Sequence, residues 1–504
     1  MDVYAADFAS RNREAYNLYI EALGHWADYR YEESEVLLDR ALEMAPDFTM
    51  ARYRLAMVKA DTSRTDEAQA DIEVAMREAS RLPQREGLYI QAAEAYIGRR
   101  LDDAIAAYQS LLDLYPYETE ARHLLAQILD LLGRYEEEQE HLDILSRLVP
   151  DDPTVWSMQG NLALHRQDFS KAIQDFQRYI ELLPDSPNGV HLLGDAYRGQ
   201  GELDLAAEQY IAALDLDPEF HYSSTSLAVV EFLRGKQQEA ETRLRALVAD
   251  TTAPHRNRID AVFELAAILR SQGRFQDTAV ALSSLAQPIA EEQVREAMSL
   301  AIQGMSWTEI GDFAKARQLI EQAVDRSPGV PTRYLFARGL LELAEEDLEQ
   351  VLLTAETILE GALPPDNPDR TEDKVAAYLR GMVYLSQGKF DSAIEELNRS
   401  ISLDGFEYAI YRVGLAQALL AMDRTMEAMA AARQAADQID HSDPRLDLQL
   451  DRLRAKLVLA QVQEAMDRPE AAAELANELL ETWSQSDPGL PDIEKARGLV
   501  AASG

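Results

Sequence analysis

The 504-residue chain contains no cysteine and no long run of apolar residues. Without thiols, neither a disulfide framework nor a thiolate metal site can form, and this absence suits the cytoplasm and the periplasm equally. No apolar run approaches the roughly 20 residues that a helix needs to span a bilayer. Residues 1–7 also lack the basic and then apolar layout of a signal peptide. We therefore expect a cytoplasmic protein, or a periplasmic one if the chain is a fragment of a membrane-anchored protein.

Basic residues are scarce relative to acidic ones. The chain has 49 Lys and Arg against 89 Asp and Glu, which gives a net charge of −40 at pH 7. A field of that sign repels duplex DNA and anionic membranes, so we expect no nucleic-acid partner and no direct membrane insertion. Two interpretations of the acidity stay open. It keeps a long protein soluble, or it serves a protein or peptide partner with a basic surface.

Motifs for catalysis, cofactors and metals are lacking as well. The eight histidines are scattered, and no Gly-rich loop is followed by the lysine that a phosphate-cradling loop needs. Carboxylate pairs such as Asp102 and Asp103 fall in turns or at helix starts, where acids favour the helix dipole. The hydroxyl run from Ser223 to Ser226 has no histidine base at a fixed helical spacing, although His221 is near. We expect no enzyme activity, no cofactor and no metal.

What the chain does have is a repeat with a period of 34 residues. Pro116, Pro150, Pro184 and Pro218 follow one another at that interval, and Thr252 takes the next position. Between them the same order returns: a bulky residue, a small residue four positions later, a turn residue, and a second set of apolar and small residues. A fixed period of this size is the signature of a repeat protein in which each unit stacks on the next.

Each unit has the pattern of two helices joined by a tight turn. Trp156 and Gly160 belong to one helical face, and Ala172 and Phe176 belong to the face of the following helix. Pro184 stops the second helix, because proline has no N–H to donate and clashes with the preceding turn. The small residues let the two helices approach closely while the aromatic rings fill the seam. A single pair cannot bury this face alone, so neighbouring pairs must stack on it.

This pattern resembles the tetratricopeptide repeat, with five consecutive copies in register between Tyr115 and Thr252. The resemblance implies an all-α fold, a right-handed α-solenoid superhelix of about thirteen helix-turn-helix repeats. We expect a regular N-terminal array of about seven repeats over residues 1–252. A C-terminal array of about six repeats with longer helices and loops follows over residues 253–483, and residues 484–504 form a capping segment.

The phase of the repeat slackens after the regular block. Gly235, Gly273 and Gly311 occupy turn positions 38 residues apart, so helices or linkers lengthen by about one turn. Residues 251–258 are the first candidate hinge, and the Pro- and charge-rich residues 361–374 are a candidate surface loop.

Three further expectations concern the later repeats. Glu346 stands where other repeats have a turn glycine. The stretch from His441 to Leu446 is expected to start a long helix that reaches about Ala465. A last helix is expected from Asp492 to Ala501, where it would cover the exposed edge of the array.

In repeats of this family the inner surface is lined by the first helix of each pair. The resemblance therefore implies a partner-binding groove at residues beside the packing face: Asn161, His191, Asp195, Arg198, Tyr222, Thr225, Phe232, Asp260 and Phe263. Their amide, imidazole, charged and aromatic groups suit an extended or helical peptide. The competing interpretation is a solvated helix face, in which Arg198 pairs with Asp195 or Asp204.

Two other surfaces follow from the resemblance. Chaperone-binding members of the family clamp a terminal carboxylate with lysines and asparagines. This chain lacks those lysines, since the corresponding places hold His123, Gln127, Ser157 and Asn161. Repeat arrays also associate through their ends, and the candidate patch for this is Tyr16, Tyr19 and Trp26.

Three hypotheses about function stay open. The first is a non-catalytic scaffold that binds a protein or peptide on the inner face. The second is a sensory or regulatory module, because residues 82–90 and 112–116 resemble repeat arrays that follow kinase, cyclase or winged-helix domains in bacterial signalling proteins. The third is a glycosyl- or sulfo-transferring repeat protein, which would need a catalytic domain.

Overall fold

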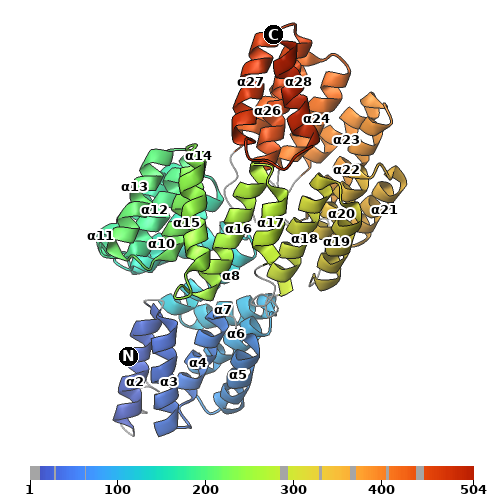
Figure 1. Cartoon of the computed structure of the whole chain (residues 1–504). Helices are drawn as coiled ribbons and strands as arrows, with labels where there is room; N and C mark the ends of the chain where they lie inside the picture. The colour runs from blue at the N-terminus through green and yellow to red at the C-terminus, as the bar shows by residue number, and fades with distance from the viewer. Residues whose placement is uncertain are drawn as a thin grey trace. The chain divides into compact units, whose positions relative to one another are not determined.

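The computed structural model of the chain describes residues 12–27, 30–62, 64–283, 293–327, 332–363, 370–403, 408–438 and 448–503. Within these ranges every regular element is an α-helix (Figure 1). The chain divides between Pro184 and Asp185 into two compact units. In each unit, consecutive helices pack on one another as pairs. This arrangement is the all-α repeat fold that the 34-residue period predicts.

Among its described residues, the first unit holds five helix pairs. Their helices are α2 (Arg13–Ala27), α3 (Tyr31–Met44), α4 (Thr49–Asp61), α5 (Thr65–Ala79), α6 (Gln84–Ile97), α7 (Leu101–Leu114), α8 (Thr119–Leu131), α9 (Tyr135–Leu148), α10 (Pro153–His165) and α11 (Phe169–Leu182).

The described part of the second unit holds eight pairs and a final single helix. Its regular part is α12 (Pro187–Gln200), α13 (Leu203–Leu216), α14 (His221–Leu233), α15 (Gln237–Ala249), α16 (His255–Ser271), α17 (Phe275–Ser283), α18 (Gln293–Ile310) and α19 (Phe313–Arg326). Its last part is α20 (Thr332–Ala344), α21 (Leu348–Glu360), α22 (Glu372–Ser386), α23 (Phe390–Ser402), α24 (Ala409–Ala421), α25 (Thr425–Asp437), α26 (Leu448–Ala465), α27 (Pro469–Thr482) and α28 (Pro491–Ala502). The thirteen pairs agree with the number expected from the sequence.

The predicted period is confirmed in the positions where first helices begin. Thr119, Pro153, Pro187, His221 and His255 start five successive first helices, each 34 residues after the last. The prolines occupy the first helical position, where a missing N–H costs nothing because that group has no partner within the helix. The repeat is thus a repeat of structure as well as of sequence.

The turn inside a pair places one residue in the left-handed backbone region. Gly133, Gly201 and Gly235 do so with φ of 66°, 87° and 80°. Gln167 and Glu346 take the same conformation with φ of 58° and 60° although they carry a Cβ. Left-handed backbone costs an L-residue roughly 1–2 kcal/mol. The packing of the two helices therefore holds the turn residue in the left-handed conformation even where that residue is not glycine.

The seam between the two helices of a pair depends on small residues facing large ones, as expected. A Cβ added to Gly160 would lie 2.3 Å from the ring of Phe176, and one added to Gly194 would lie 2.7 Å from the ring of Tyr210. Both rings are fully buried. Because the glycine surface is the wall against which the ring packs, the seam has no room for a larger side chain.

The expected lengthening of the repeat after the regular block is confirmed. Helix α16 has 17 residues and α18 has 18, whereas α14 has 13. Of the candidate hinge at 251–258, residues 251–254 form a short turn and residues 255–258 are already the first residues of α16. In the turn, Asp250 accepts hydrogen bonds from the backbone N–H and the hydroxyl of Thr252, at 2.9 and 2.6 Å. The expected loop at 361–374 follows α21, and its residues 364–369 lie outside the described residues.

Two expectations concern the end of the chain. The expected helix start at 441–446 lies outside the described residues, but α26 ends at Ala465 as expected. The last helix is also present as α28. It does more than cover an edge, because one apolar cluster joins residues of α26, α27 and α28 to Phe275 at the start of α17. The second unit therefore folds back on its own middle.

Candidate partner-binding surfaces

First helices of neighbouring pairs contact one another directly. Helix α4 contacts α6 in the first unit, and α12 contacts α14, which contacts α16, in the second. One face of each first helix is thereby turned toward the next first helix. The side chains beside these contacts form the surface where the sequence predicts a groove.

Four of the predicted groove residues form one cluster: His191, Asp195, Arg198 and Tyr222. Nδ1 of His191 is 3.1 Å from the hydroxyl of Ser223 on α14, and its Nε2 is 3.4 Å from a carboxylate oxygen of Asp195. The phenol of Tyr210 donates a 2.6 Å hydrogen bond to Asp195, and the ring of Tyr222 lies 6.5 Å from the imidazole. Burial lowers the pKa of His191, while Asp195 partly opposes that shift.

Arg198 extends this cluster toward α16. Its Nη2 lies 3.4 Å from Asp195, so of the two carboxylates proposed from the sequence it is Asp195 that pairs with it. Asp204 instead pairs with Arg234, at 2.5 Å. Burial alone would lower the pKa of Arg198, but Tyr210, Asp195 and Glu264 raise it, so the guanidinium stays charged. Burial raises the pKa of Glu264 on α16.

The other predicted groove residues are placed differently from one another. Tyr222 is 46% exposed, and Asp260 pairs with Arg295 of α18 at 2.6 Å. Thr225 donates its hydroxyl hydrogen to the carbonyl of His221 in its own helix, and Phe232 and Phe263 are half-buried against the core. Asn161 lies on α10 and belongs to the first unit.

A feature that the sequence did not indicate is a cavity of about 400 Å³ within the first unit. Side chains from the first helices α2, α4, α6 and α8 contribute most of its lining. Its apolar wall includes Leu23, Trp26, Met57, Tyr96, Leu124 and Ile128. Pockets of this volume are typical of sites for small molecules or for single side chains of a partner.

The polar part of the cavity is organised by Arg54. Its side chain is only 3% exposed, its guanidinium lies 4.5 Å from the centre of the Trp26 ring, and Nη2 donates to Glu120 at 2.5 Å. Among the described residues, Nε and Nη1 of Arg54 have no hydrogen-bond partner. Burial alone would lower the pKa of Arg54, but Glu120 raises it. The Trp26 indole donates to Asp61 at 2.9 Å.

Two of the positions that correspond to the chaperone clamp also line this cavity. They are His123 and Gln127. Nδ1 of His123 lies 2.9 Å from the carbonyl oxygen of Thr119, and Nε2 lies 3.7 Å from Asp152. At these two clamp positions the cavity therefore presents an imidazole and an amide, and Asp152 lies beside the imidazole.

The proposed end patch is not an exposed surface. Tyr19 is buried in the core of the first unit, Tyr16 packs against that core, and Trp26 lines the cavity. The sequence signal behind the proposed patch was the number of aromatic residues in the first helix. These aromatic residues lie in the core and at the cavity. The spacing of residues within one helix could not show this, because it does not tell which face of α2 meets α4.

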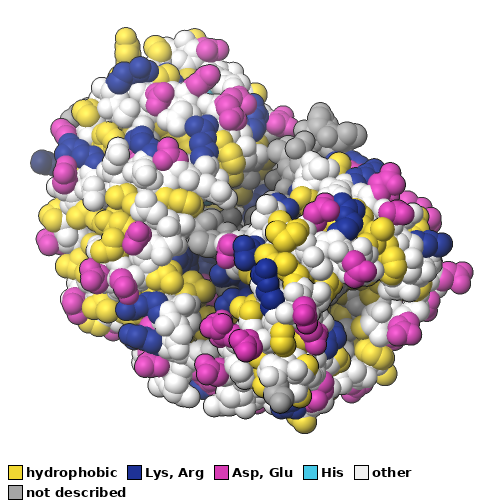
Figure 2. Space-filling model, turned by 90° about the horizontal axis from the view of Figure 1, so that it is seen from above, with side chains coloured by type: hydrophobic (Ala, Val, Ile, Leu, Met, Phe, Trp, Pro, Cys, Tyr) yellow, Lys and Arg dark blue, Asp and Glu magenta, His cyan; other side chains and the backbone are white. Residues whose placement is uncertain are grey.

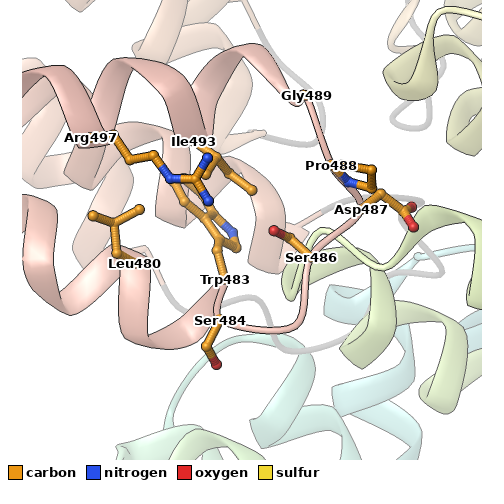
Figure 3. Close-up of a pocket in the computed structure, with 9 residues that line it drawn as sticks. All are labelled: Leu480, Trp483, Ser484, Ser486, Asp487, Pro488, Gly489, Ile493 and Arg497. Atoms are coloured by element: carbon orange, nitrogen blue, oxygen red, sulfur yellow. The ribbon is translucent and has the colours of Figure 1, made fainter.

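A second cavity, of about 350 Å³, lies beside the connection between α27 and α28. Figure 3 shows Leu480, Ile493 and Arg497 on the two helices, Trp483 directly after α27, and Asp487 on the connection. The carboxylate of Asp487 accepts a 2.9 Å hydrogen bond from the backbone N–H of Gln276. The polar groups of this connection thus hold it on the turn between α16 and α17.

Charge and ligand-forming groups on the described residues give no sign of another kind of site. On the face drawn in Figure 2, acidic and basic side chains are interspersed. No group of three or more His, Asp or Glu side chains able to hold a metal occurs among the residues that the structure describes. Nor does this part of the chain contain a helix long and apolar enough to cross a membrane.

Comparison with known protein families identifies the repeat. Two family models described as tetratricopeptide repeat match the chain. One matches residues 95–162, and the other matches residues 139–187, 191–257 and 378–444. The matches cover α12 to α15, on which most of the predicted groove lies.

Known proteins are similar to the chain over limited stretches. Human superkiller complex protein 3 is 24% identical over 244 residues, which are 45% of this chain and 15% of that protein. Human protein O-mannosyl-transferase TMTC1 is 24% identical over 162 residues, 30% of this chain and 18% of that protein. The solved structure of MamA 41-end from Desulfovibrio magneticus RS-1 is 18% identical, with a TM-score of 0.30 over 32% of this chain and 92% of that one. The chain thus spans less than a fifth of the length of these two curated relatives.

Proposed function

This chain belongs to the tetratricopeptide-repeat family, and on that premise we propose that it is a non-catalytic scaffold that binds a peptide segment of a partner protein along its first helices. One observation carries the proposal: a continuous row of polar and aromatic side chains crosses four successive first helices of the second unit. His191 of α12 meets Ser223 of α14, Arg198 of α12 interacts with Glu264 of α16, and α16 is joined to α18 through Asp260.

The row has the composition that peptide recognition needs. Its charged groups are held in place by neighbours, Arg198 by Asp195 of the same helix and Asp260 by Arg295 of α18, so they lose little side-chain freedom when a partner binds. Tyr222 stands at the row with nearly half of its surface exposed and offers a ring for packing. A peptide that lies across α12, α14 and α16 would find fixed donors and acceptors together with this ring.

The similarity to a named subunit of a complex supports a scaffold role. Superkiller complex protein 3 is, by its name, part of a protein complex, and the chain matches a part of it. The transferase TMTC1 is matched over only 18% of its length, so its activity is not extended to this chain. The second hypothesis, a sensory module that responds to a peptide or a small ligand, is tested by the same experiment.

The absence of cysteine makes a site-specific test possible. The substitution Tyr222→Cys gives the chain a unique thiol, to which a photoactivatable cross-linker is attached. Tyr117→Cys is the matched control, since Tyr117 is also an exposed tyrosine, 78% exposed, and belongs to the first unit. After irradiation in lysate of the source organism, cross-linked peptides are mapped by mass spectrometry.

We expect one partner segment to be attached at position 222 and absent at position 117. The attachment should be lost when Arg198→Met is added to a chain whose helicity is unchanged. Equal labelling at both positions, or labelling that ignores Arg198→Met, would reject the groove. Labelling by no protein, combined with protection of α12–α16 from hydrogen exchange by the small-molecule fraction of the lysate, would favour the sensory module.

A further inference from the structure

We propose that the cavity of the first unit receives the basic side chain, lysine or arginine, of a partner's peptide segment. This inference deepens the proposed function and rests on it, because it specifies the chemistry of the segment that the scaffold binds. It concerns a site in the first unit, formed by other residues than the row around His191.

The charge of the lining favours a cation. Three carboxylates line the cavity, those of Asp61, Glu120 and Asp152, against the basic side chains of Arg54 and His123. The positive charge of Arg54 is buried and already paired with Glu120. Asp61 is an exposed residue of this lining, and its carboxylate accepts the neutral indole N–H of Trp26. Burial of the carboxyl group raises the pKa of Asp61, while Trp26 and the charge of Arg54 oppose that shift. An entering cation therefore meets a surplus of negative charge.

The apolar wall favours a long aliphatic stem below that cation. Trp26, Tyr96, Leu124 and Ile128 present rings and branched side chains on the same lining as Asp61. Lysine and arginine bury their methylene stems on apolar surface while the charged head reaches a polar group. Aromatic faces attract the same heads through their quadrupoles. The combination suits these two side chains better than it suits a carboxylate or a purely apolar group.

Arg54 acts as an organiser of the wall. Its guanidinium covers one face of Trp26 and fixes Glu120 of α8 from its place on α4. Because a buried guanidinium with free N–H groups is costly, it is retained where it orders other groups. Here it orders the ring of Trp26 and the carboxylate of Glu120, which belong to the first and the fourth pair. The cavity is thus preformed, so little ordering cost remains for a ligand.

The charge of the whole chain works in the same direction. A net charge of −40 draws basic segments toward the surface and speeds their encounter. This general attraction does not depend on any one carboxylate. Binding in the cavity does depend on individual carboxylates of its lining. The general attraction and the local site are therefore distinguished by comparing a variant that loses one charge inside the cavity with a variant that loses one charge outside it.

The test uses capped, fluorescently labelled heptapeptides that differ only at the central residue: lysine, arginine, norleucine or glutamate, flanked by leucines. Binding to the full chain is measured by fluorescence anisotropy. Asp61→Asn removes one of the three negative charges of the cavity lining and keeps an acceptor for Trp26. Glu136→Gln removes a charge from the same unit at a residue with a 91% exposed side chain outside the cavity lining.

We expect the lysine and arginine peptides to bind about tenfold more tightly than the norleucine peptide, as a partly desolvated ion pair would provide. Asp61→Asn should remove most of that advantage, and Glu136→Gln should change it less than about twofold. Equal binding of lysine and norleucine, tighter binding of glutamate, or equal effects of the two substitutions would overturn the inference.

A second pair of variants keeps the test decisive if Asp61→Asn disturbs folding. Gln127 is exposed on the cavity lining, so Gln127→Lys supplies a cation from the chain itself. It should abolish the preference for basic peptides, whereas Gln127→Glu should keep or increase it. If basic peptides still bind in the cavity while no partner cross-links at position 222, the groove of the second unit is rejected and the cavity site stands. A partner that cross-links there and ignores both Asp61→Asn and Gln127→Lys would reject the cavity alone.

Discussion

Trp483, directly after α27, donates its indole hydrogen to the backbone carbonyl of Ser271 at the end of α16, across 212 residues of sequence and a distance of 3.0 Å. The backbone of Asp487 strengthens the same contact by donating to the carbonyl of Gly273 at 2.9 Å. In an open repeat array each pair contacts only its neighbours. The second unit departs from that rule, because its last helices close on its middle ones.

This closure has a consequence for Gly273. Its φ is 70°, and a Cβ added there would lie 3.0 Å from Cβ of Ser486 and 3.1 Å from Cδ1 of Leu490. Gly273→Ala should therefore cost the backbone strain of about 1–2 kcal/mol and a further 1–3 kcal/mol of overpacking. Gly235→Ala is the matched control, since Gly235 has φ of 80° and nothing within 4 Å of the added Cβ. Urea denaturation of both variants checks the difference, and equal losses would show that the closure does not resist the methyl group.

Arg454 is the ionic counterpart of Trp483 in the closure. It bridges Glu309 of α18, at 2.7 Å, and Asp492 of α28, at 3.0 Å. Arg454→Met removes the cation that pairs with Glu309 and leaves Asp492 with Lys495, at 3.1 Å, in a partly buried place, so we expect a loss of about 2–4 kcal/mol in the free energy of unfolding.

The control for this loss is Arg497→Met, which breaks an exposed pair with Glu494 and should cost less than about 1 kcal/mol. Hydrogen exchange adds a second measurement. Arg454→Met should increase exchange in α18 and in α28 together, although many residues separate them in sequence. Faster exchange in α28 alone would mean that the bridge to Glu309 contributes little.

The left-handed turn at Gln167 gives a prediction of increased stability. Gln167 is exposed and has φ of 58°, where glycine carries no steric cost. Gln167→Gly should raise the free energy of unfolding of the first unit by about 0.5–1 kcal/mol, the strain relieved less the entropy of glycine. Gly133→Gln makes the reverse change at a turn of the same unit, with φ of 66°, and should lower it by a similar amount. Thermal unfolding of the two variants measures both signs, and a change of the same sign in both would refute the strain argument.

Much of the fold could be predicted because its determinants are local and periodic. The contact between Gly160 and Phe176 joins two helices of one pair, and the 34-residue spacing shows the pairs directly. The pairing of Arg198 with Asp195 lies within one helix and was one of two alternatives. Contacts of this kind are visible in the pattern of a single repeat.

The closure and the cavity could not be predicted in this way. Trp483 and Ser271 meet only because many small rotations between pairs add up to bring distant helices together. The cavity combines Trp26, Arg54 and Glu120 from three different pairs. Each of these residues has an ordinary role in its own repeat, and their joint role depends on the angle between repeats, which no single repeat encodes.

The last prediction concerns Glu138, a buried acid on α9. Its side chain is 2% exposed, and its Oε2 has no hydrogen-bond partner among the described residues. Burial, with a contribution from Asp130, raises the pKa of Glu138 to about 8, against 4.5 for an unperturbed glutamate, although Arg166 opposes the shift. A raised pKa in the folded state means that the proton stabilises the fold. That stabilisation is complete below the unfolded pKa and is lost as the pH rises through the folded one.

Wild-type protein should therefore lose stability between pH 6 and pH 8, by up to about 1.4 kcal/mol per pH unit from this group. Glu138→Gln keeps the shape of a protonated glutamate and does not titrate, so its stability relative to wild type should rise by about 2–3 kcal/mol over that range. Glu136→Gln, two residues away and exposed, should show no such rise. Urea denaturation at several pH values measures both differences. A constant difference for Glu138→Gln would show that amide packing, and not titration of the buried carboxyl, distinguishes the variant, because only titration makes the difference depend on pH.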